Sequence, residues 1–182
     1  MQLRRERPDD RDDVAALHRA AFGAHGEKVG RLVDSLRSAP AAKEALSVVA
    51  DESGQIVGHA MFTRSLLDAP RQLVSVSVLS PVAVVPERQG EGIGSAMVRH
   101  GLAVLDRRSV PLVFLEGDPA YYGRFGFVPG RDQGFRRPSL RIPEPAFQAI
   151  RLSAYEPWMS GTLVYSETFW RHDAVGLRDG AA

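Results

Sequence analysis

The sequence predicts a single α/β domain in which short strands alternate with amphipathic helices. The chain has 182 residues, of which 44% are hydrophobic, and this is enough to bury one full core. Apolar residues recur with a period of two in some segments and at helical spacing in others. A cluster of glycines also joins one strand-like run to the clearest helical stripe of the chain.

The N-terminal part is predicted to form one strand, two helices and a hairpin. Gln2–Glu6 is the first strand, and Pro8–Asp10 supplies residues that begin a helix with an apolar face. A second amphipathic helix follows and ends at Ala39–Pro40. Leu46–Asp51 and Gln55–Thr63 are rich in β-forming residues and are separated by three turn-forming residues, so we expect an antiparallel pair.

The middle of the chain is predicted to contain a strand, a helix and a buried strand. Leu73–Val85 alternates valine with serine, and Ser80–Pro81 predicts a bend or bulge in this strand. The apolar stripe that starts at Ile93 indicates a helix. Leu112–Leu115 has the continuous apolar pattern of a central strand, and a brief helix is expected to start at Asp118–Pro119.

The C-terminal part is less regular. Pro129–Pro145 is rich in proline and glycine and is predicted to be a long ordered loop. Ala146–Leu152 is expected to add a strand or a helical turn, and Thr162–Phe169 a last strand. We find no interdomain linker, so we expect one domain over residues 1–172 and a flexible tail over residues 173–182.

The composition argues against several classes of protein. The 23 Lys and Arg residues balance 22 Asp and Glu to a formal charge of +1, so no nucleic-acid partner is expected. Because there is no cysteine, and because His25, His59 and His100 are isolated in the sequence, we also expect no metal site. Met1–Arg11 is highly charged and Leu73–Pro86 is interrupted by polar residues, so we expect no membrane segment and a cytoplasmic location.

The glycine cluster is the strongest functional signal in the sequence. Gly90, Gly92 and Gly94 stand at alternate positions between a strand and a helix. Without a Cβ the backbone can approach a ligand, and the first N–H groups of a helix lack intrahelical partners, which favours a phosphate-like anion. A tight connection that binds no ligand is the alternative. The P-loop and dinucleotide-binding spacings are both missing, which argues against nucleotide hydrolysis and hydride transfer.

Two segments resemble a known family. Gln89–Gly94 reads Gln-Gly-Glu-Gly-Ile-Gly and resembles motif A of the GNAT superfamily of N-acetyltransferases, whose core is Gln/Arg-x-x-Gly-x-Gly/Ala. Leu112–Phe127 resembles the fifth strand and the Tyr-x-x-x-Gly-Phe helix of the family, in the Asp-Pro-Ala-Tyr-Tyr version of the YhbS-like branch. The resemblance covers Gln2–Val128. It implies the GNAT fold, with a central mixed, mostly antiparallel sheet of about six to seven strands flanked by about four helices.

This resemblance implies acetyl-CoA as the acyl donor and no metal. In the family the strand before the turn contacts the pantetheine arm of the cofactor, and the turn itself holds the pyrophosphate. The cofactor-binding residues implied in this way are Val82, Ala83, Val84, Arg88, Gln89, Gly90, Gly92, Ile93, Gly94 and Ser95.

Amide formation from a thioester requires an uncharged amine, a stabilised oxyanion and a proton source for the thiolate. Tyr122 falls on the tyrosine position of the family and is predicted to be the general acid, although it could instead pack under the cofactor or exchange roles with Tyr121. We expect the oxyanion to meet the N–H of Val84. Glu116, at the exit of its strand, is the best carboxylate for the base, with an ion pair to an arginine as the alternative. Glu27 is a weaker candidate for the acceptor pocket, since such a residue is usually solvated.

These matches predict an N-acetyltransferase that moves the acetyl group of acetyl-CoA to a primary amine of a small molecule or peptide. Direct attack in a ternary complex is expected because no cysteine is present to carry the acyl group. The resemblance identifies neither the acceptor nor the oligomeric state, for which a homodimer is one alternative. A non-catalytic acyl-CoA sensor or interaction domain, and a protein that binds another phosphorylated ligand, are the competing hypotheses.

Overall fold

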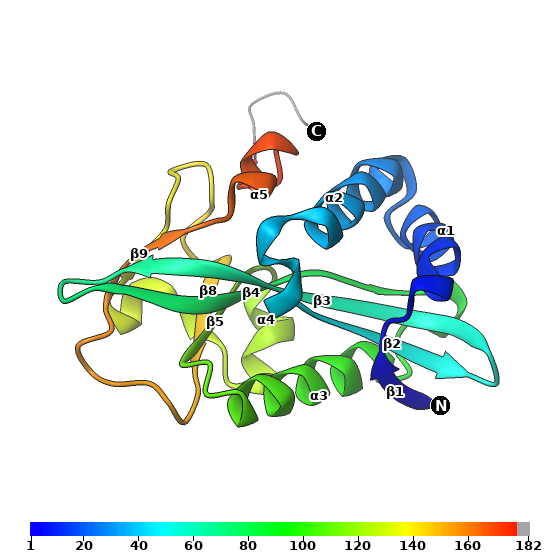
Figure 1. Ribbon diagram of the computed structural model, residues 1–182, viewed down its shortest axis with the longest axis horizontal. Helices are drawn as coiled ribbons and strands as arrows, with labels where there is room; N and C mark the ends of the chain where they lie inside the picture. Colours follow the sequence, from blue (N-terminus) through cyan, green and yellow to red (C-terminus); the bar gives the residue numbers. More distant parts are fainter. Residues whose placement is uncertain (178–182) are drawn as a thin grey trace. The chain divides into compact units, whose positions relative to one another are not determined.

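The computed structural model describes residues 1–177, which contain nine strands and five α-helices (Figure 1). The chain forms two compact units. Unit 1 comprises Met1–Thr63 and Leu79–Val104, and unit 2 comprises Arg64–Val78 and the chain from Leu105 onward. Two long strands, β3 (Gln55–Asp68) and β4 (Leu73–Val84), are neighbours in the sheet and contribute residues to both units.

The strands of unit 1 form as the sequence predicts. β1 (Gln2–Arg5) pairs with β2 (Leu46–Glu52), and β2 pairs with β3, both in antiparallel orientation. The turn between β2 and β3 contains Ser53 and Gly54, whose φ angles of 53° and 91° lie in the left-handed region that suits tight hairpin turns.

An irregularity in β3 decides which of its side chains face which helix. The register between β2 and β3 shifts near the turn, so that Val57 is an extra residue on β3. A bulge of this kind moves the residues on one side of it to the opposite face of the sheet. As a result Ile56 joins a core cluster with residues of the first helix, and His59 contacts His18 of the same helix.

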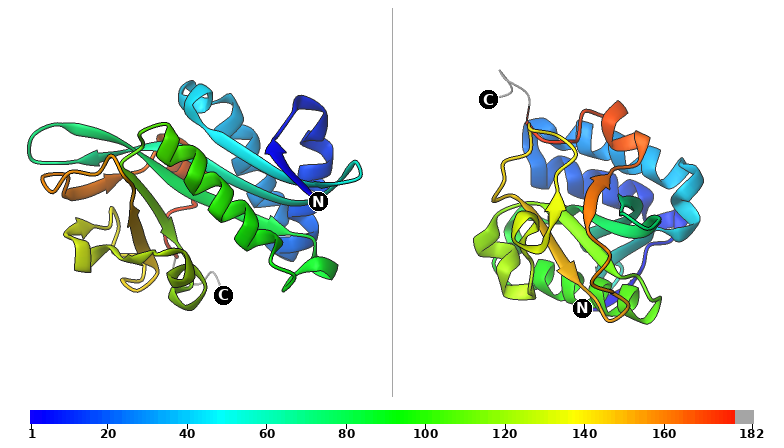
Figure 2. Two further views of the ribbon diagram at one scale, coloured as in Figure 1. Left: turned by 90° about the horizontal axis from the view of Figure 1, so that it is seen from below. Right: turned by 90° about the vertical axis from the view of Figure 1, so that its left-hand side faces the viewer.

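The helices of unit 1 cover both faces of its strands. α1 (Arg11–Phe22) and α2 (Gly26–Ser38) lie side by side over one face, and α3 (Ile93–Arg107) covers the other (Figures 1 and 2). Contact between α3 and β3 is close because glycines stand on both elements. A Cβ on Gly101 would come within 2.1 Å of the Phe62 ring, and one on Gly58 within 2.8 Å of Met97. The position of α3, and of the turn before it, therefore depends on these glycines.

Unit 2 is built around a buried central strand, β5 (Leu112–Glu116), which is parallel to β4 at Ser77 and Val78. β5 also pairs with β8 (Phe147–Arg151) in antiparallel orientation, and β8 pairs with the two-residue strand β6 (Val128–Pro129). The predicted strand at Ala146–Leu152 is therefore present.

The other strands of unit 2 extend the sheet from the end of β3. β9 (Gly161–Val164) runs antiparallel to the C-terminal residues of β3 (Figure 2). It also pairs in parallel with the two-residue strand β7 (Phe135–Arg136). Parts of the predicted loop at Pro129–Pro145 therefore join the sheet.

Short helices complete the fold. The two remaining α-helices are α4 (Pro119–Tyr122) and α5 (Glu167–Arg171). Residues 1–177 also contain 3₁₀ helices at Pro8–Asp10, Gly23–His25, Pro40–Glu44, Pro86–Arg88, Gly123–Phe125 and Gly130–Gln133. No helix in this part of the chain combines the length and the apolar character needed to span a membrane.

The prediction of a last strand over Thr162–Phe169 is wrong beyond Val164. The strand ends there, and Ser166 takes an extended conformation immediately before α5. Ser166, Glu167 and Thr168 favour the start of a helix, and Phe169 then reaches the core from that helix with only 1% of its surface exposed. The alternation of apolar and polar residues in the sequence continues past Val164, where the strand ends.

The predicted tail begins with residues that make defined contacts. The Val175 side chain is fully buried, and the N–H of Ala174 and of Leu177 donate to the carbonyls of Phe169 and Arg141. The packed chain therefore continues past residue 172, at least to Leu177. Residues 178–182 of the predicted tail lie outside the described residues.

Candidate functional site

The glycine turn lies in unit 1, between the end of β4 and the start of α3. Gly90 and Gly92 have φ angles of 84° and 85°, a region that residues with a Cβ rarely adopt. A Cβ at either position would meet no atom within 4 Å, so the space in front of the turn is open. Backbone conformation, rather than crowding within the chain, therefore requires glycine at these two positions.

This turn presents a row of backbone donors. After Gln89, the first N–H that reaches a carbonyl is that of Ala96, which donates to Gly92 at 2.9 Å. In the described chain, the N–H groups from Gly90 to Ser95 therefore have no acceptor of their own. They lie at the N-terminus of a helix of fifteen residues, where the helix dipole adds a partial positive charge. The residues fit a diphosphate-like anion, which is what their sequence predicted.

Several predicted cofactor residues have side chains that are buried or already engaged within the chain. Ala83 and Ile93 are buried in the core, with 4% and 3% of their surfaces exposed. Arg88 is engaged by two carboxylates, Glu91 at 2.7 Å and Glu52. The pKa of the Arg88 guanidinium is raised, chiefly by its hydrogen bond to Glu52.

The side chain of Gln89 is also engaged. Its amide donates to the carbonyl of Val84 at 3.1 Å and so ties the turn to the strand that precedes it. The predicted bend in this strand coincides with a cis peptide bond between Ser80 and Pro81.

Tyr122, the predicted acid, lies in unit 2 at the end of α4. Asp118 caps this helix by accepting a hydrogen bond from the N–H of Ala120 at 2.9 Å. The Tyr122 ring packs on the backbone of Gly117, where a Cβ would approach it to 2.3 Å. Burial, together with the neighbouring Tyr121, raises the pKa of Tyr122 to about 12. The phenol therefore stays protonated at neutral pH, and no partner for its hydroxyl is found within residues 1–177.

Tyr121 has a different environment from its neighbour. Its ring lies 4.9 Å from that of Tyr122, and the guanidinium of Arg124 covers it at 4.6 Å from the ring centroid. This cation–π contact assigns Tyr121 a packing role. The assignment of the donor role to Tyr122 stays a prediction from the sequence.

Glu116, the predicted base, ends β5 in unit 2 and holds two other segments. One carboxylate oxygen accepts from the Tyr165 hydroxyl at 2.8 Å, and the other from the N–H of Gly176 at 3.0 Å. Burial raises the pKa of Glu116 above its usual value, partly offset by these hydrogen bonds and by Arg141. The direction suits a base, while the two hydrogen bonds give the carboxylate a structural role. Glu27, in unit 1, is exposed and lies 3.8 Å from Arg19, so it has the solvated character of a surface residue.

The prediction that His59 is isolated is wrong, because a buried polar chain connects it to His18, Ser47 and Glu6. Ser47 donates to the Glu6 carboxylate, and its oxygen lies 2.8 Å from His59 Nε2. His59 Nδ1 in turn lies 3.0 Å from His18 Nε2. Since the Ser47 proton points to Glu6, His59 must donate from Nε2 and accept at Nδ1 from His18, with both rings neutral.

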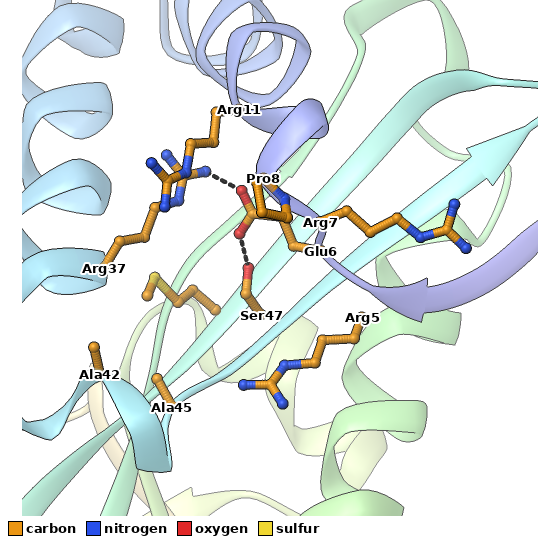
Figure 3. A pocket seen from close by; sticks show the side chains of 10 residues that line it. Arg5, Glu6, Arg7, Pro8, Arg11, Arg37, Ala42, Ala45 and Ser47 are labelled. Carbon is orange, nitrogen blue, oxygen red and sulfur yellow. Dashed lines mark hydrogen bonds and ion pairs between the residues drawn. The ribbon is translucent and has the colours of Figure 1, made fainter.

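Sequence reasoning missed this chain because its members come from α1, β2, β3 and the segment between β1 and the first 3₁₀ helix, which carries Glu6 (Figure 3). The pairing of His18 with His59 depends on the bulge in β3 and on how α1 crosses the sheet, neither of which has a local signal. Across residues 1–177, no group of three or more His, Cys, Asp or Glu residues is arranged to hold a metal ion.

Comparison with known proteins assigns the family. The family described as "Acetyltransferase (GNAT) domain" matches residues 2–130. The uncharacterised N-acetyltransferase YjhQ of Escherichia coli K12 is 37% identical over 136 residues, covering 74% of each chain. The uncharacterised N-acetyltransferase YhbS of the same organism is 33% identical over 155 residues, covering 84% of this chain and 88% of that protein.

Solved structures of GNAT acetyltransferases have the same fold as this chain. The crystal structure of E. coli YhbS in complex with CoA has a TM-score of 0.80 and 29% identity, and the match covers 93% of this chain and 92% of that one. A GNAT family acetyltransferase from Brucella melitensis in complex with acetyl-CoA has a TM-score of 0.72 and 34% identity, with coverage of 92% and 97%. Family match, sequence relatives and fold together show that this chain belongs to the GNAT acetyltransferase family.

Proposed function

We propose that the protein is an acetyl-CoA-dependent N-acetyltransferase that acetylates a primary amine of a small molecule or peptide. The observation that carries the proposal is the row of unpaired N–H groups from Gly90 to Ser95 in an open turn. Such a row is complementary to a diphosphate, and two related proteins have structures with CoA or acetyl-CoA. The side chains of Arg88 and Gln89 support the turn through their contacts within the chain.

The proposed reaction is direct transfer. The uncharged amine attacks the thioester carbonyl, a C–N bond forms, and the C–S bond breaks as the tetrahedral intermediate collapses. The amine loses one proton and the departing sulfur gains one, so charge and atoms balance. Since the chain has no cysteine, an acyl-cysteine intermediate is ruled out, and a ternary complex is the simplest scheme.

Tyr122 is proposed as the donor to the leaving sulfur. Its pKa of about 12 keeps the proton on the phenol over the whole neutral range. A free thiol has a pKa near ~8.5, so transfer of the Tyr122 proton to the released thiolate is uphill by roughly three to four pKa units. Transfer to the less basic sulfur before C–S cleavage is further uphill. We therefore propose that Tyr122 hydrogen-bonds to the sulfur as charge develops and completes the transfer only in concert with cleavage.

Two further roles remain proposals. Val84 would offer its backbone N–H to the oxyanion, because preorganised donors of this kind stabilise tetrahedral intermediates. Glu116 would accept the amine proton, directly or through water, and its raised pKa favours proton acceptance. Glu27 would contribute to acceptor binding only if the acceptor carries a positive charge.

An acyl-CoA sensor without turnover is the competing function. The observation that favours it is the engagement of both Glu116 oxygens by Tyr165 and Gly176, which gives this carboxylate a structural role without catalysis.

Three further properties remain predictions from the sequence. They are a cytoplasmic location, a homodimer and a single domain over residues 1–172.

The donor site is tested by titrating CoA into the protein in a calorimeter. Gly92→Ala should weaken CoA binding by about tenfold or more, because alanine disfavours a φ of 85° and the donors must move. Gly54→Ala is the matched control, since it has a φ of 91°, equally open space and no place in the turn. Equal CoA affinity in both variants, or no heat with the unmodified protein, would overturn the proposed donor site.

Turnover is tested separately. Acetyl-CoA is mixed with a panel of primary amines, and release of free thiol is followed. An enzyme releases thiol with at least one amine faster than by hydrolysis alone. CoA binding without thiol release across the panel would favour the sensor.

A further inference from the structure

Gln148 is a fully buried polar side chain in unit 2 that has no part in the reaction proposed above. It lies on β8, where its Cα pairs with that of Leu115 on β5. Its Nε2 donates to the carbonyl of Gly117 at 3.0 Å, and its Oε1 is buried without a donor within residues 1–177. An apolar residue would avoid the cost of this unpaired oxygen, so the hydrogen bond to Gly117 is what glutamine contributes here.

Gly117 directly follows β5 and is held on both sides by the same neighbouring segment. Its N–H donates to the carbonyl of Ala146 at 3.0 Å, which continues the pairing of β5 with β8 by one more hydrogen bond. In the described part of the chain, no backbone N–H donates to the carbonyl of Gly117. The Gln148 amide therefore supplies the hydrogen bond that the sheet does not supply.

The ring and the backbone of Tyr122 both depend on the peptide group that Gln148 holds. The ring packs on Gly117, where a Cβ would come within 2.3 Å of Tyr122 Cε2. The carbonyl of Asp118 accepts from the N–H of Tyr122 at 3.0 Å, and the Asp118 carboxylate caps α4. Since the Gly117 carbonyl belongs to the peptide group that joins these two residues, its direction affects both the surface under the ring and the start of the helix.

We propose that Gln148 is a positioning residue for Tyr122 and acts through the peptide group between Gly117 and Asp118. The inference rests on the proposed function, in which Tyr122 donates to the leaving sulfur. Without the Gln148 amide the Gly117 carbonyl turns to another donor, and the ring that packs on Gly117 loses its fixed place. A small misplacement of a catalytic group costs a large factor in rate, so Gln148 affects turnover without touching the substrate.

The first test measures kcat and KM of Gln148→Met with acetyl-CoA and the primary amine that releases thiol fastest. Methionine fills a similar space but has no N–H donor. We expect kcat to fall by about tenfold or more with little change in the KM for acetyl-CoA, because the glycine turn is unaltered. If this variant does not fold, Gln148→Asn, which withdraws the amide by one methylene group, takes its place in every measurement.

A double-mutant cycle separates positioning from general damage to the fold. If Gln148 acts through Tyr122, adding Gln148→Met to Tyr122→Phe should lower kcat no further. The proposal would be overturned by an unchanged kcat in Gln148→Met, or by equal losses with and without the Tyr122 hydroxyl. An unchanged kcat in Tyr122→Phe would instead overturn the donor role itself, so the two failures are distinguishable.

The ionisation of Tyr122 gives a second readout, which needs no turnover. NMR of ¹³C-labelled tyrosine follows the phenol with pH, and Tyr122→Phe identifies its signal. Burial raises the pKa of Tyr122 to about 12. A ring that leaves its place meets more water, so Gln148→Met should lower this pKa by about one unit or more. A pKa that stays at about 12 would show that the ring has not moved and would overturn the proposal.

Gln133→Met is the matched control in the same unit. The Gln133 amide also donates to main-chain carbonyls, those of Val128 at 3.3 Å and Ala149 at 2.8 Å. The control removes these contacts but leaves the peptide group under the ring intact, so kcat and the pKa of Tyr122 should stay as in the unmodified protein. Equal effects of Gln133→Met and Gln148→Met would indicate a general loss of packing and would contradict the proposal.

Discussion

Tyr122 illustrates how a single side chain is prepared for chemistry by its surroundings. The absence of a Cβ at Gly117 lets the ring lie against the backbone, and aromatic neighbours remove water from one side of it. Burial therefore raises the pKa of the phenol to about 12, so that it remains a hydrogen-bond donor under all ordinary conditions.

Replacing Tyr122 with phenylalanine should lower kcat by about 10²-fold or more while CoA affinity changes little, because only the donor to the leaving sulfur is lost. Steady-state rates and CoA calorimetry measure the two effects. Tyr121→Phe is the control and should keep most of the rate.

The pH–rate profile of the unmodified enzyme gives a second test. Deprotonation of Tyr122 should cause no loss of rate up to about pH 10, because the pKa of Tyr122 is about 12. A Tyr122→Phe enzyme with unchanged kcat would remove this residue from the mechanism.

Glu116 can be tested for catalysis and for structure separately. Glu116→Gln removes the charge and one of two hydrogen bonds, so a base role predicts a loss of about 10²-fold or more in kcat/KM. Tyr165→Phe keeps the carboxylate but removes a hydrogen bond that lowers its pKa, so the acid limb of the pH–rate profile should move to higher pH. An unmoved acid limb in Tyr165→Phe, with only a lower stability in both variants, would indicate a purely structural Glu116.

At the scale of elements, the packing of α3 on β3 fixes where the helix begins and hence where the turn donors lie. Gly101 allows this approach, since a Cβ would overlap the Phe62 ring at 2.1 Å. Phe62 is almost fully buried and cannot easily move aside.

Gly101→Ala should lower the free energy of unfolding by about 1–3 kcal/mol through overpacking, although alanine is the better helix former. Gly30→Ala is the matched control, because Gly30 lies in α2 with no atom within 4 Å of a new Cβ. It should raise stability by about 0.5–1 kcal/mol. Urea denaturation of both variants measures the difference, and a Gly101→Ala protein as stable as Gly30→Ala would contradict the packing described.

At the scale of the whole molecule, the buried histidines make stability depend on pH. Burial lowers the pKa of His18 to about 3 and also lowers that of His59. In the unfolded chain both titrate near ~6.5, so below that pH the unfolded state takes up protons that the native state refuses. The contribution of the two neutral histidines to the free energy of unfolding is therefore fully present above about pH 7 and decreases as the pH falls below this value.

Glu6 also makes the folded protein less stable at low pH. Its pKa is lowered to about 2, so its contribution to the free energy of unfolding is lost as the pH falls to that value. Glu116 has the opposite effect on the pH dependence of stability. Because its pKa is raised, the native state binds a proton at a higher pH than the unfolded state does, so acidification favours the folded protein at this group.

We expect the free energy of unfolding to fall by roughly 2 kcal/mol between about pH 7 and pH 5 from His18 alone. Denaturant titrations at both values measure it. His18→Gln keeps a neutral donor for His59 and should reduce the pH dependence, whereas His25→Gln, at an exposed position, should leave it unchanged. A protein equally stable at both pH values would show that the pair is not buried as a neutral unit.

Local patterns were sufficient for most of the fold. The strands at Leu46–Asp51 and Leu112–Leu115, and the helix from Ile93, form where the sequence predicts them because their side-chain period matches their burial. Prediction failed at Thr162–Phe169, where an alternating pattern ran on into a helix. The glycine turn was also predictable, since its conformation depends on residues adjacent in the chain.

The sequence by itself therefore determined most of the elements, the glycine turn with its open donors and the family resemblance, because each of these rests on neighbouring residues. Tertiary structure alone decided that His59 meets His18, that Glu116 holds Tyr165 and Gly176, and that Gln148 donates to Gly117. These contacts join residues far apart in the chain, and the charge state of each group depends on the neighbours and the burial that folding brings.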